Sequence, residues 1–265
     1  MTRSKVMVAD SSISAPQMMD FWRKIGDGSI DGIRLQRFLH NPSWDSDKTE
    51  VTLARAINIL GEQKIVSIDL AAKARKIGVG FIAEFYNRRI RYSEMTLREC
   101  AEQNRDGDAD WRLTYCFGFS LRELRDQIGT DPKSQPCCYS NDWWLKKQED
   151  EWATAKPETG YYLVDFNGRF ARTSWNNQER EIAKLGGQFF RTPEAVIAEA
   201  ITTIFQVHKE RLLEEWYHWG SSLGSGGGRV FVGLFVQKGW DLYGGLPDYD
   251  SDGDLRVCIA QKFQS

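Results

Sequence analysis

This sequence lacks several features that mark common protein classes. Its longest apolar tract, around residues 195–205, carries Glu199 inside a helical pattern, so it is not a membrane span. The opening MTRSKVMVADSSIS has no apolar core of the kind found in signal peptides. We therefore expect no membrane span, no signal peptide and a cytoplasmic location.

Cysteine and histidine are scarce and scattered. The five cysteines form no series of paired spacings and no CxxC motif, and the three histidines lie far apart. This pattern favours reduced thiols and gives no support for a metal held by cysteine. The cysteines are residues 100, 116, 137, 138 and 258.

Motifs of the common hydrolases and nucleotide-binding enzymes are also missing. There is no GxSxG, no GxxxxGK[ST] and no HExxH. His218 is the best candidate for a general base, but its neighbours Tyr217 and Trp219 favour a packed histidine at a helix end. The adjacent Glu214 and Glu215 point in different directions on a helix. The sequence predicts a protein that is not an enzyme.

Charge of one sign is not in excess: 35 Lys and Arg stand against 37 Asp and Glu, a net charge of −2. This balance argues against a general nucleic-acid or anionic-membrane binder. One local basic stretch, residues 73–98, holds seven Lys and Arg against two Glu. A solvated helix face is the favoured interpretation, and a nucleic-acid-associated protein is the alternative.

The chain has enough apolar content for a large core, with 41% hydrophobic and 12% aromatic residues over 265 positions. We expect an α+β protein with a mainly helical N-terminal region, residues 1–138. Helical patterns cover 17–24, 32–39, 51–60, 65–77 and 96–103, residues 79–92 could be strand or helix, and 104–110 is a loop. Residues 129–160 predict a linker that three tryptophans keep packed.

The second domain, residues 139–265, has a clearer order of strand, two helices and several antiparallel strands. A strand is predicted at 161–166, then a helix from an N-cap at Ser174 to a stop at Gly186. A longer helix follows Pro193 and reaches about Trp216. Strands are predicted at 229–236 and 255–260, and the last would pair with the first.

Several long motifs carry a resemblance to a known family. The segments WWLKKQEDEWATAKPETGYYLVDFNGRF, SWNNQEREIAKLG, PEAVIAEAITTIF, ERLLEEWYHWG and GRVFVGLFV...LRVCIAQKF look like proteins of uncultivated candidate-phylum bacteria. Those proteins resemble the variable proteins of diversity-generating retroelements, which are similar in fold to C-type lectins of the formylglycine-generating-enzyme type. The resemblance covers roughly residues 120–263 and implies non-catalytic ligand binding.

In such proteins a retroelement rewrites selected codons of the C-terminal strands and loops, here a hypervariable region at residues 220–262. The resemblance implies a framework of Arg229, Val230, Val232, Gly233, Phe235, Leu255, Arg256 and Val257. Trp240 departs from the pattern, because changes at the adenines of an Asn codon do not yield Trp. The variable, ligand-facing positions would be Gly228, Phe231, Leu234, Val236, Trp240, Asp241, Tyr243, Gly244, Gly245, Asp248, Tyr249, Asp250 and Asp252.

Composition independently favours a recognition surface at this end of the chain. Residues 220–265 contain 10 of the 23 glycines, and residues 241–254 contain five Asp and two Tyr. Strand alternation places Phe231 on the face opposite Val230 and Val232. The partner expected is a macromolecule, most simply a protein.

The alternating aspartates of PDYDSDGDLRVC leave a calcium-dependent structural or adhesion module as another alternative. Asp248, Asp250, Asp252 and Gly253 match an EF-type calcium loop, but its position 12 is Ile259 and no bidentate carboxylate stands there. The flanking segments are also not helical. Calcium is therefore the one cofactor the sequence suggests, and only as a weak site.

Overall fold

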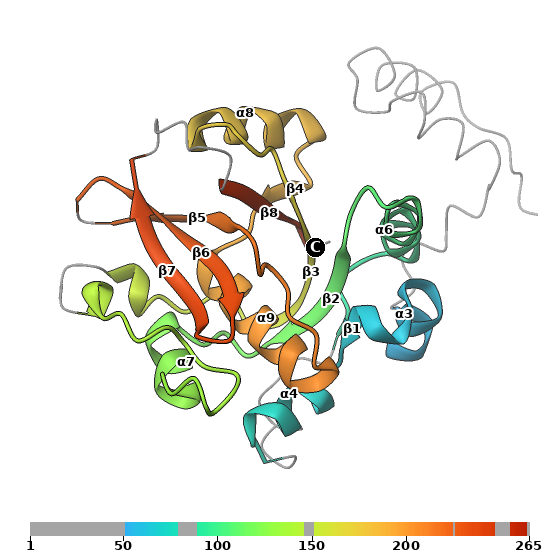
Figure 1. The fold of residues 1–265 in the computed structure, drawn as a ribbon. Coiled ribbons are helices and arrows are strands. Elements are labelled where there is room, and N and C mark those ends of the chain that lie inside the picture. Colours follow the sequence, from blue (N-terminus) through green and yellow to red (C-terminus); the bar gives the residue numbers. More distant parts are fainter. Residues whose placement is uncertain (1–50, 79–88, 146–150, 225, 247–254, 264–265) are drawn as a thin grey trace, which may run out of the picture. The chain divides into compact units, whose positions relative to one another are not determined.

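A mixed eight-stranded sheet organises the residues that the computed structural model describes, which are 51–78, 89–145, 151–224, 226–246 and 255–263 (Figure 1). The pairs β1–β2 and β5–β8 are parallel and the other pairs are antiparallel. Along the sheet the order is β1 (Ile65–Val66), β2 (Trp111–Cys116), β3 (Gly160–Arg169), β8 (Leu255–Gln261), β5 (Tyr217–Leu223), β6 (Arg229–Val236) and β7 (Gly239–Gly245), while β4 (Phe189–Arg191) also pairs with β8.

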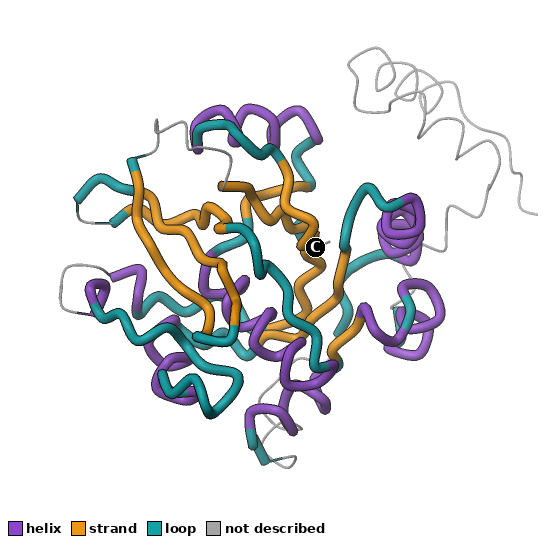
Figure 2. Tube along the Cα trace, viewed as in Figure 1, coloured by secondary structure: helices purple, strands orange, loops and turns teal. Residues whose placement is uncertain are grey.

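Helices surround this sheet, as Figure 2 shows, and confirm the α+β class. Most begin at a serine or threonine whose side chain accepts a backbone N–H of the first turn, as Ser174 does from Asn177. None of the described helices is long and apolar enough to cross a membrane. Their bounds are α3 (Leu53–Leu60), α4 (Ile68–Arg75), α6 (Glu94–Asp106), α7 (Leu121–Ile128), α8 (Trp175–Leu185) and α9 (Glu194–His208).

Helix α9 forms the centre of the core. Every residue from Glu194 to Ile204 is buried, because the helix packs against β2, β5 and β6 as well as against α4 and α7. A helix that is apolar around most of its circumference needs such packing on several sides. The tract that the sequence shows as its longest apolar run is therefore a core helix.

The closing strand pairs with the opening one, as the sequence predicts. Val164 of β3 lies opposite Ala260 of β8, and Asp165 lies opposite Ile259. Strand β3 also pairs with β2 along its other edge, so one sheet continues across the expected boundary between residues 138 and 139. Residues 49–265 form a single compact unit.

Two predicted helices are shorter in the structure. The helix expected to reach Trp216 ends at His208, where Lys209 takes a left-handed conformation with φ 59°, and β5 begins at Tyr217. The helix expected over 65–77 begins only at Ile68, because Ile65 and Val66 pair with β2 as β1. Strand pairing overrides the helical pattern at Ile65 and Val66, whereas residues 209–216 form an irregular connection between α9 and β5.

The segment predicted as a packed linker is packed. The side chains of Trp144 and Trp152 are buried, and their ring centroids lie 6.0 Å apart. The backbone of Cys138 forms an isolated parallel β-bridge with that of Trp240 in β7. The segments expected at 17–24 and 32–39, and most of 79–92, lie outside the described residues.

Candidate ligand-binding surface

Aromatic side chains align across β5, β6 and β7 on the face of the sheet opposite α9. The register places Trp219 opposite Phe231, and Phe231 opposite Tyr243. Ring centroids are 5.0 Å apart in the first pair and 5.8 Å in the second, which is stacked. Such cross-strand aromatic pairs stabilise a sheet. Tyr243 is exposed, whereas Trp219 and Phe231 are buried, so Phe231 is not open to a ligand, contrary to its place in the expected variable set.

The next row along the same face carries a carboxylate. Here Tyr217, Gly233 and Asp241 lie opposite one another. The Tyr217 hydroxyl donates to Asp241 Oδ2 at 3.0 Å, and Asn141 Nδ2 donates to Asp241 Oδ1. Burial, followed by the charge of Asp241, raises the pKa of Tyr217, so this phenol remains a hydrogen-bond donor.

Gly233 lets β5 and β6 approach closely in this row. A Cβ at this position would lie 2.2 Å from the carbonyl oxygen of Trp216. Any larger side chain would push the two strands apart. This close contact agrees with the expectation that Gly233 belongs to the constant framework and not to the variable positions.

The opposite face of the same strands belongs to the core. Val232 and Leu242 are fully buried, and so is Trp240, whose indole N–H donates to Thr202 Oγ1 of α9 at 3.0 Å. Trp240 therefore cannot face a ligand, contrary to its place in the expected variable set. The alternation predicted for Phe231 against Val230 and Val232 is confirmed, since Phe231 packs with Trp219 and not with the α9 cluster.

Trp143 extends the aromatic face beyond the edge strand β7. Its indole N–H donates to the carbonyl oxygen of Leu242 at 3.1 Å, and its ring centroid lies 6.2 Å from that of Tyr243. Sequence reasoning placed Trp143 in a linker and missed this role. The tryptophan content of the linker was the only available signal.

The other end of the face is basic and aromatic. The Arg229 guanidinium lies 3.9 Å from the ring centroid of Trp175, and that of Arg191 lies 4.5 Å from the same ring. Arg191 is buried, and burial lowers its pKa to about 10 although it pairs with Glu179. The face thus runs from an arginine end, through a row of rings, to Asp241.

The remaining variable positions are spread over this region. Gly228 and Gly245 lie near the arginine end, where a Cβ on Gly245 would touch the Trp219 ring at 3.1 Å. Leu234 and Val236 follow an irregularity after Gly233, at the turn between β6 and β7. Gly244 is exposed beside Trp143. Asp248, Tyr249, Asp250 and Asp252 lie outside the described residues.

His218 is packed in the interior, as expected. Its side chain is buried, and burial, followed by the charge of Arg256, lowers its pKa to about 3. It is therefore neutral at physiological pH. Within the described ranges no three His, Cys, Asp or Glu side chains come together as metal ligands. The calcium loop proposed from Asp248, Asp250 and Asp252 falls in the undescribed segment 247–254.

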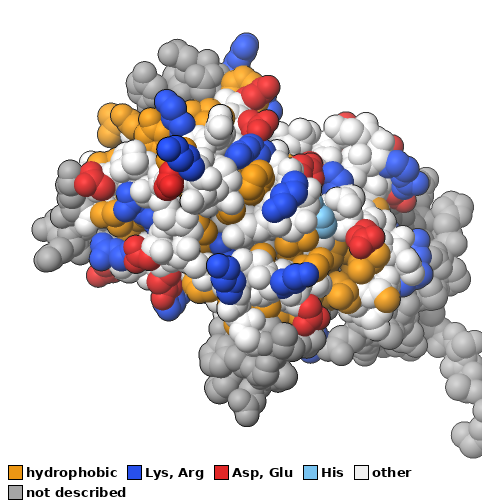
Figure 3. All heavy atoms as spheres, turned by 60° about the horizontal axis from the view of Figure 1, so that its bottom comes forward, with side chains coloured by type: hydrophobic (Ala, Val, Ile, Leu, Met, Phe, Trp, Pro, Cys, Tyr) orange, Lys and Arg blue, Asp and Glu red, His pale blue; other side chains and the backbone are white. Residues whose placement is uncertain are grey.

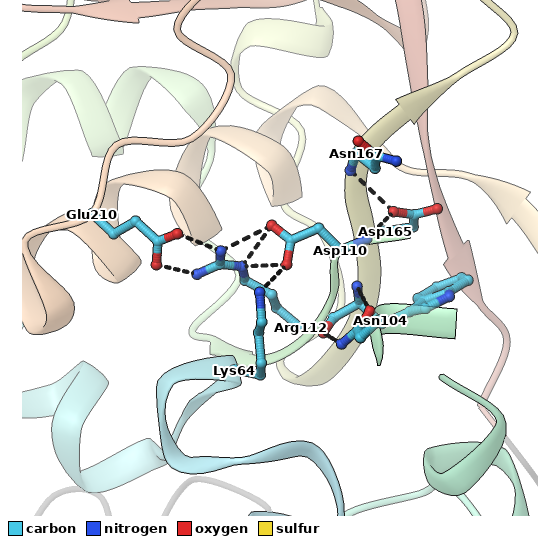
Figure 4. A network of polar contacts seen from close by, with 8 residues as sticks. Lys64, Asn104, Asp110, Arg112, Asp165, Asn167 and Glu210 are labelled. Atoms are coloured by element: carbon cyan, nitrogen blue, oxygen red, sulfur yellow. Dashed lines mark hydrogen bonds and ion pairs between the residues drawn. The ribbon is translucent and has the colours of Figure 1, made fainter. Parts of the chain in front are cut away.

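A polar network elsewhere in the fold is structural in character. Buried Arg112 of β2 donates to both carboxylate oxygens of Glu210, at 2.6 Å each, and to those of Asp110 (Figure 4). Lys64 adds an ion pair to Asp110 at 2.6 Å. The network therefore ties β2 to the segment after α9 and to the turn before β1.

The basic stretch at 73–98 does not form one solvated face where it is described. Arg75 is buried and donates to Thr203 Oγ1, Arg91 pairs with Glu158, and Arg98 pairs with Glu94. Arg88 lies outside the described residues. On the face seen in Figure 3, Lys and Arg side chains are interspersed with Asp and Glu.

Comparison with known proteins adds no relative: no family model matches the chain, and neither a curated protein nor a solved structure is significantly similar to it. The surface on β5, β6 and β7 must therefore be interpreted from its own geometry. Its rings, Asp241 and the arginine end lie together on one face of the sheet.

Proposed function

We propose that this protein is a non-catalytic binding protein whose ligand contacts the outer face of β5, β6 and β7. The partly exposed rings of Tyr243, Trp143 and Tyr217 carry the proposal. We further propose that this face is the diversified surface of a retroelement variable protein with a C-type-lectin-like domain. The ligand would be a macromolecule, because the rings lie side by side across three strands.

Exposure of the aromatic side chains supports binding. Tyr243 is 55% exposed although its ring stacks on Phe231, and Trp143 and Tyr217 beside it are half-buried. Large aromatic residues that are held rigid and left partly open are typical of interface anchors, since little side-chain entropy is lost when a partner covers them. Trp219 and Phe231, by contrast, are covered by the fold and support the exposed rings from below.

The two faces of the strands support diversification. Positions such as Asp241 and Tyr243 point away from α9, so replacing them leaves the α9 packing intact. The alternate positions Val232 and Leu242 are buried in the core. Large-to-small changes there cost about 2–5 kcal/mol, whereas exposed positions usually change stability by within about 0.5 kcal/mol.

Sequencing the locus across a population of the source organism tests this function. We expect codon changes at Asp241 and Tyr243, beside a near-identical template repeat, with Trp240, Val232 and Leu242 unchanged. Uniform low variation across both faces would remove the diversified surface and leave the calcium alternative to be tested by titration.

A matched pair of libraries provides a second test in the laboratory. One library randomises the outward positions Asp241 and Tyr243, and the other randomises the inward positions Val232 and Leu242. The outward library should yield mostly soluble, cooperatively folding proteins and the inward one few. If the two libraries lost equal fractions of soluble, folded variants, the outer positions would contribute to the core as much as the inward ones do.

A further inference from the structure

The carboxylate of Asp241 lacks a positive partner within the described part of the chain. It is half-buried, and its oxygens accept from the Tyr217 hydroxyl, Asn141 Nδ2 and its neighbour's backbone N–H, at 2.8 Å for the last. All of these donors are neutral. None of the ion pairs among the described side chains includes Asp241.

Arg125, which lies close to Asn141, makes its contacts with other groups. Arg125 donates to the carbonyl oxygens of Ser140 and Asn141, and its guanidinium lies 5.7 Å from the Trp144 ring centroid. Arg229 lies on the same sheet face, but four residues along β6 from Gly233, the cross-strand neighbour of Asp241, or about 13 Å away. Among the described residues, therefore, no arginine or lysine forms an ion pair with Asp241.

Aromatic rings surround this carboxylate on the exposed side. Tyr243 follows two residues later on β7 and so lies on the same face, with Trp143 beside it and Tyr217 bonded to the carboxylate. Ring faces attract cations, and a carboxylate accepts charge-assisted hydrogen bonds from a guanidinium or an ammonium group. The rings and the carboxylate together therefore favour a positively charged group in the ligand.

We infer that the surface holds a cationic side chain, an arginine or lysine of a protein partner, at Asp241 between Tyr243, Trp143 and Tyr217. This inference rests on the proposed binding function and specifies the chemistry that this version of the surface recognises. A basic side chain would neutralise a half-buried charge that none of the described side chains pairs with. In a diversified family, the preference would belong to this sequence because Asp241 is one of the changeable positions.

Two small probes that differ in charge but hardly in shape test the inference. N-acetyl-argininamide carries the guanidinium, and N-acetyl-citrullinamide replaces it by a neutral urea group. Binding is followed in the full chain by the indole N–H signal of Trp143 in ¹⁵N-labelled protein, assigned with Trp143→Phe. This reporter is suitable because that N–H donates to Leu242, the residue next to Asp241.

We expect the arginine probe to shift the Trp143 signal, and the citrulline probe to bind about tenfold more weakly or not at all. Asp241→Asn should reduce arginine binding to the citrulline level. Because an asparagine can still accept from Asn141 and from Leu242, its melting temperature should stay near that of the wild type. Glu181→Gln, on α8, is the matched control and should bind arginine normally.

Equal binding of the two probes, or undiminished arginine binding by a folded Asp241→Asn variant, would overturn the inference. A separate variant, Tyr243→Leu, keeps the charge of Asp241 and removes one ring. It should bind the arginine probe more weakly than the wild type does, but still more tightly than it binds the citrulline probe. None of these outcomes decides the proposed function, which is tested separately, since codon variation at the outer positions does not depend on the charge of the ligand.

Discussion

Replacing Glu199 by glutamine should change how stability depends on pH. Glu199 lies on α9, fully buried, and its carboxylate accepts the backbone N–H groups of Phe117, Gly118 and Phe119 at 2.6, 3.2 and 3.1 Å. Burial raises the pKa of this carboxyl from 4.5 to about 7, against the opposing effects of Arg75 and the three N–H donors. Desolvation of the charge is thus the dominant effect.

The sign of the effect follows from the raised pKa. Between pH 4.5 and about 7 the folded protein holds a proton at Glu199 that the unfolded chain has released, so stability falls as pH rises through this window. The difference between 4.5 and about 7 corresponds to about 3 kcal/mol, at roughly 1.4 kcal/mol for each pH unit. Glutamine resembles the protonated carboxyl and has no such loss.

Urea unfolding of both proteins near pH 5 and near pH 8 measures this effect. From the lower to the higher pH, Glu199→Gln should gain about 3 kcal/mol relative to the wild type, because titration of all other groups cancels in the difference. Glu181→Gln, whose carboxylate is exposed and paired with Lys184, should track the wild type within about 0.5 kcal/mol. If the difference in free energy of unfolding between the two proteins did not change with pH, or if the wild type gained stability relative to Glu199→Gln, burial would not dominate the pKa of Glu199 over Arg75 and the N–H donors.

Three further predictions concern the stability of the fold, and each is tested by urea unfolding followed through tryptophan fluorescence. Trp240→Ala should lower the free energy of unfolding by about 3–5 kcal/mol, while Tyr243→Ala, on the exposed face, should lower it by about 1 kcal/mol or less; similar losses would contradict the assigned register. Arg112→Lys should lower it by about 2–3 kcal/mol because a single ammonium cannot bridge Asp110 and Glu210 as the guanidinium does, and a neutral result would show the network to be dispensable. Gly233→Ala should lower it by about 1–3 kcal/mol through the clash with the Trp216 carbonyl oxygen, whereas Gly226→Ala, with open space around it, should have little effect.

Local signals in the sequence were sufficient for several elements. Helix α8 begins after Ser174 and ends before Gly186, as predicted, because the capping serine and the glycine at φ 112° act within one turn of each end. Strand β6 covers the predicted residues 229–236, since eight mainly apolar residues follow a glycine-rich turn. Such features depend on neighbours in the chain, which the sequence displays directly.

The segment after α9 shows where local signals were not sufficient. Residues 209–216 have a helical composition, yet α9 ends at His208 and Tyr217 enters β5. Pairing of β5 with both β6 and β8 satisfies backbone groups on each side of that strand. Helix propensity is worth only tenths of a kcal/mol per residue, so a helical composition alone does not extend α9 through the irregular segment that leads into β5.

By itself, therefore, the sequence determined the α+β class, both ends of α8, the core character of residues 194–204 and the presence of an aromatic, glycine- and aspartate-rich C-terminal region. Only the tertiary structure decided which of those aromatic residues face outward. A shift of one residue in strand register moves every side chain to the other face, and that register separates buried Trp240 from exposed Tyr243. Trp143 joined the surface, and Asn141 came to donate to Asp241, because chain segments about a hundred residues apart pack side by side.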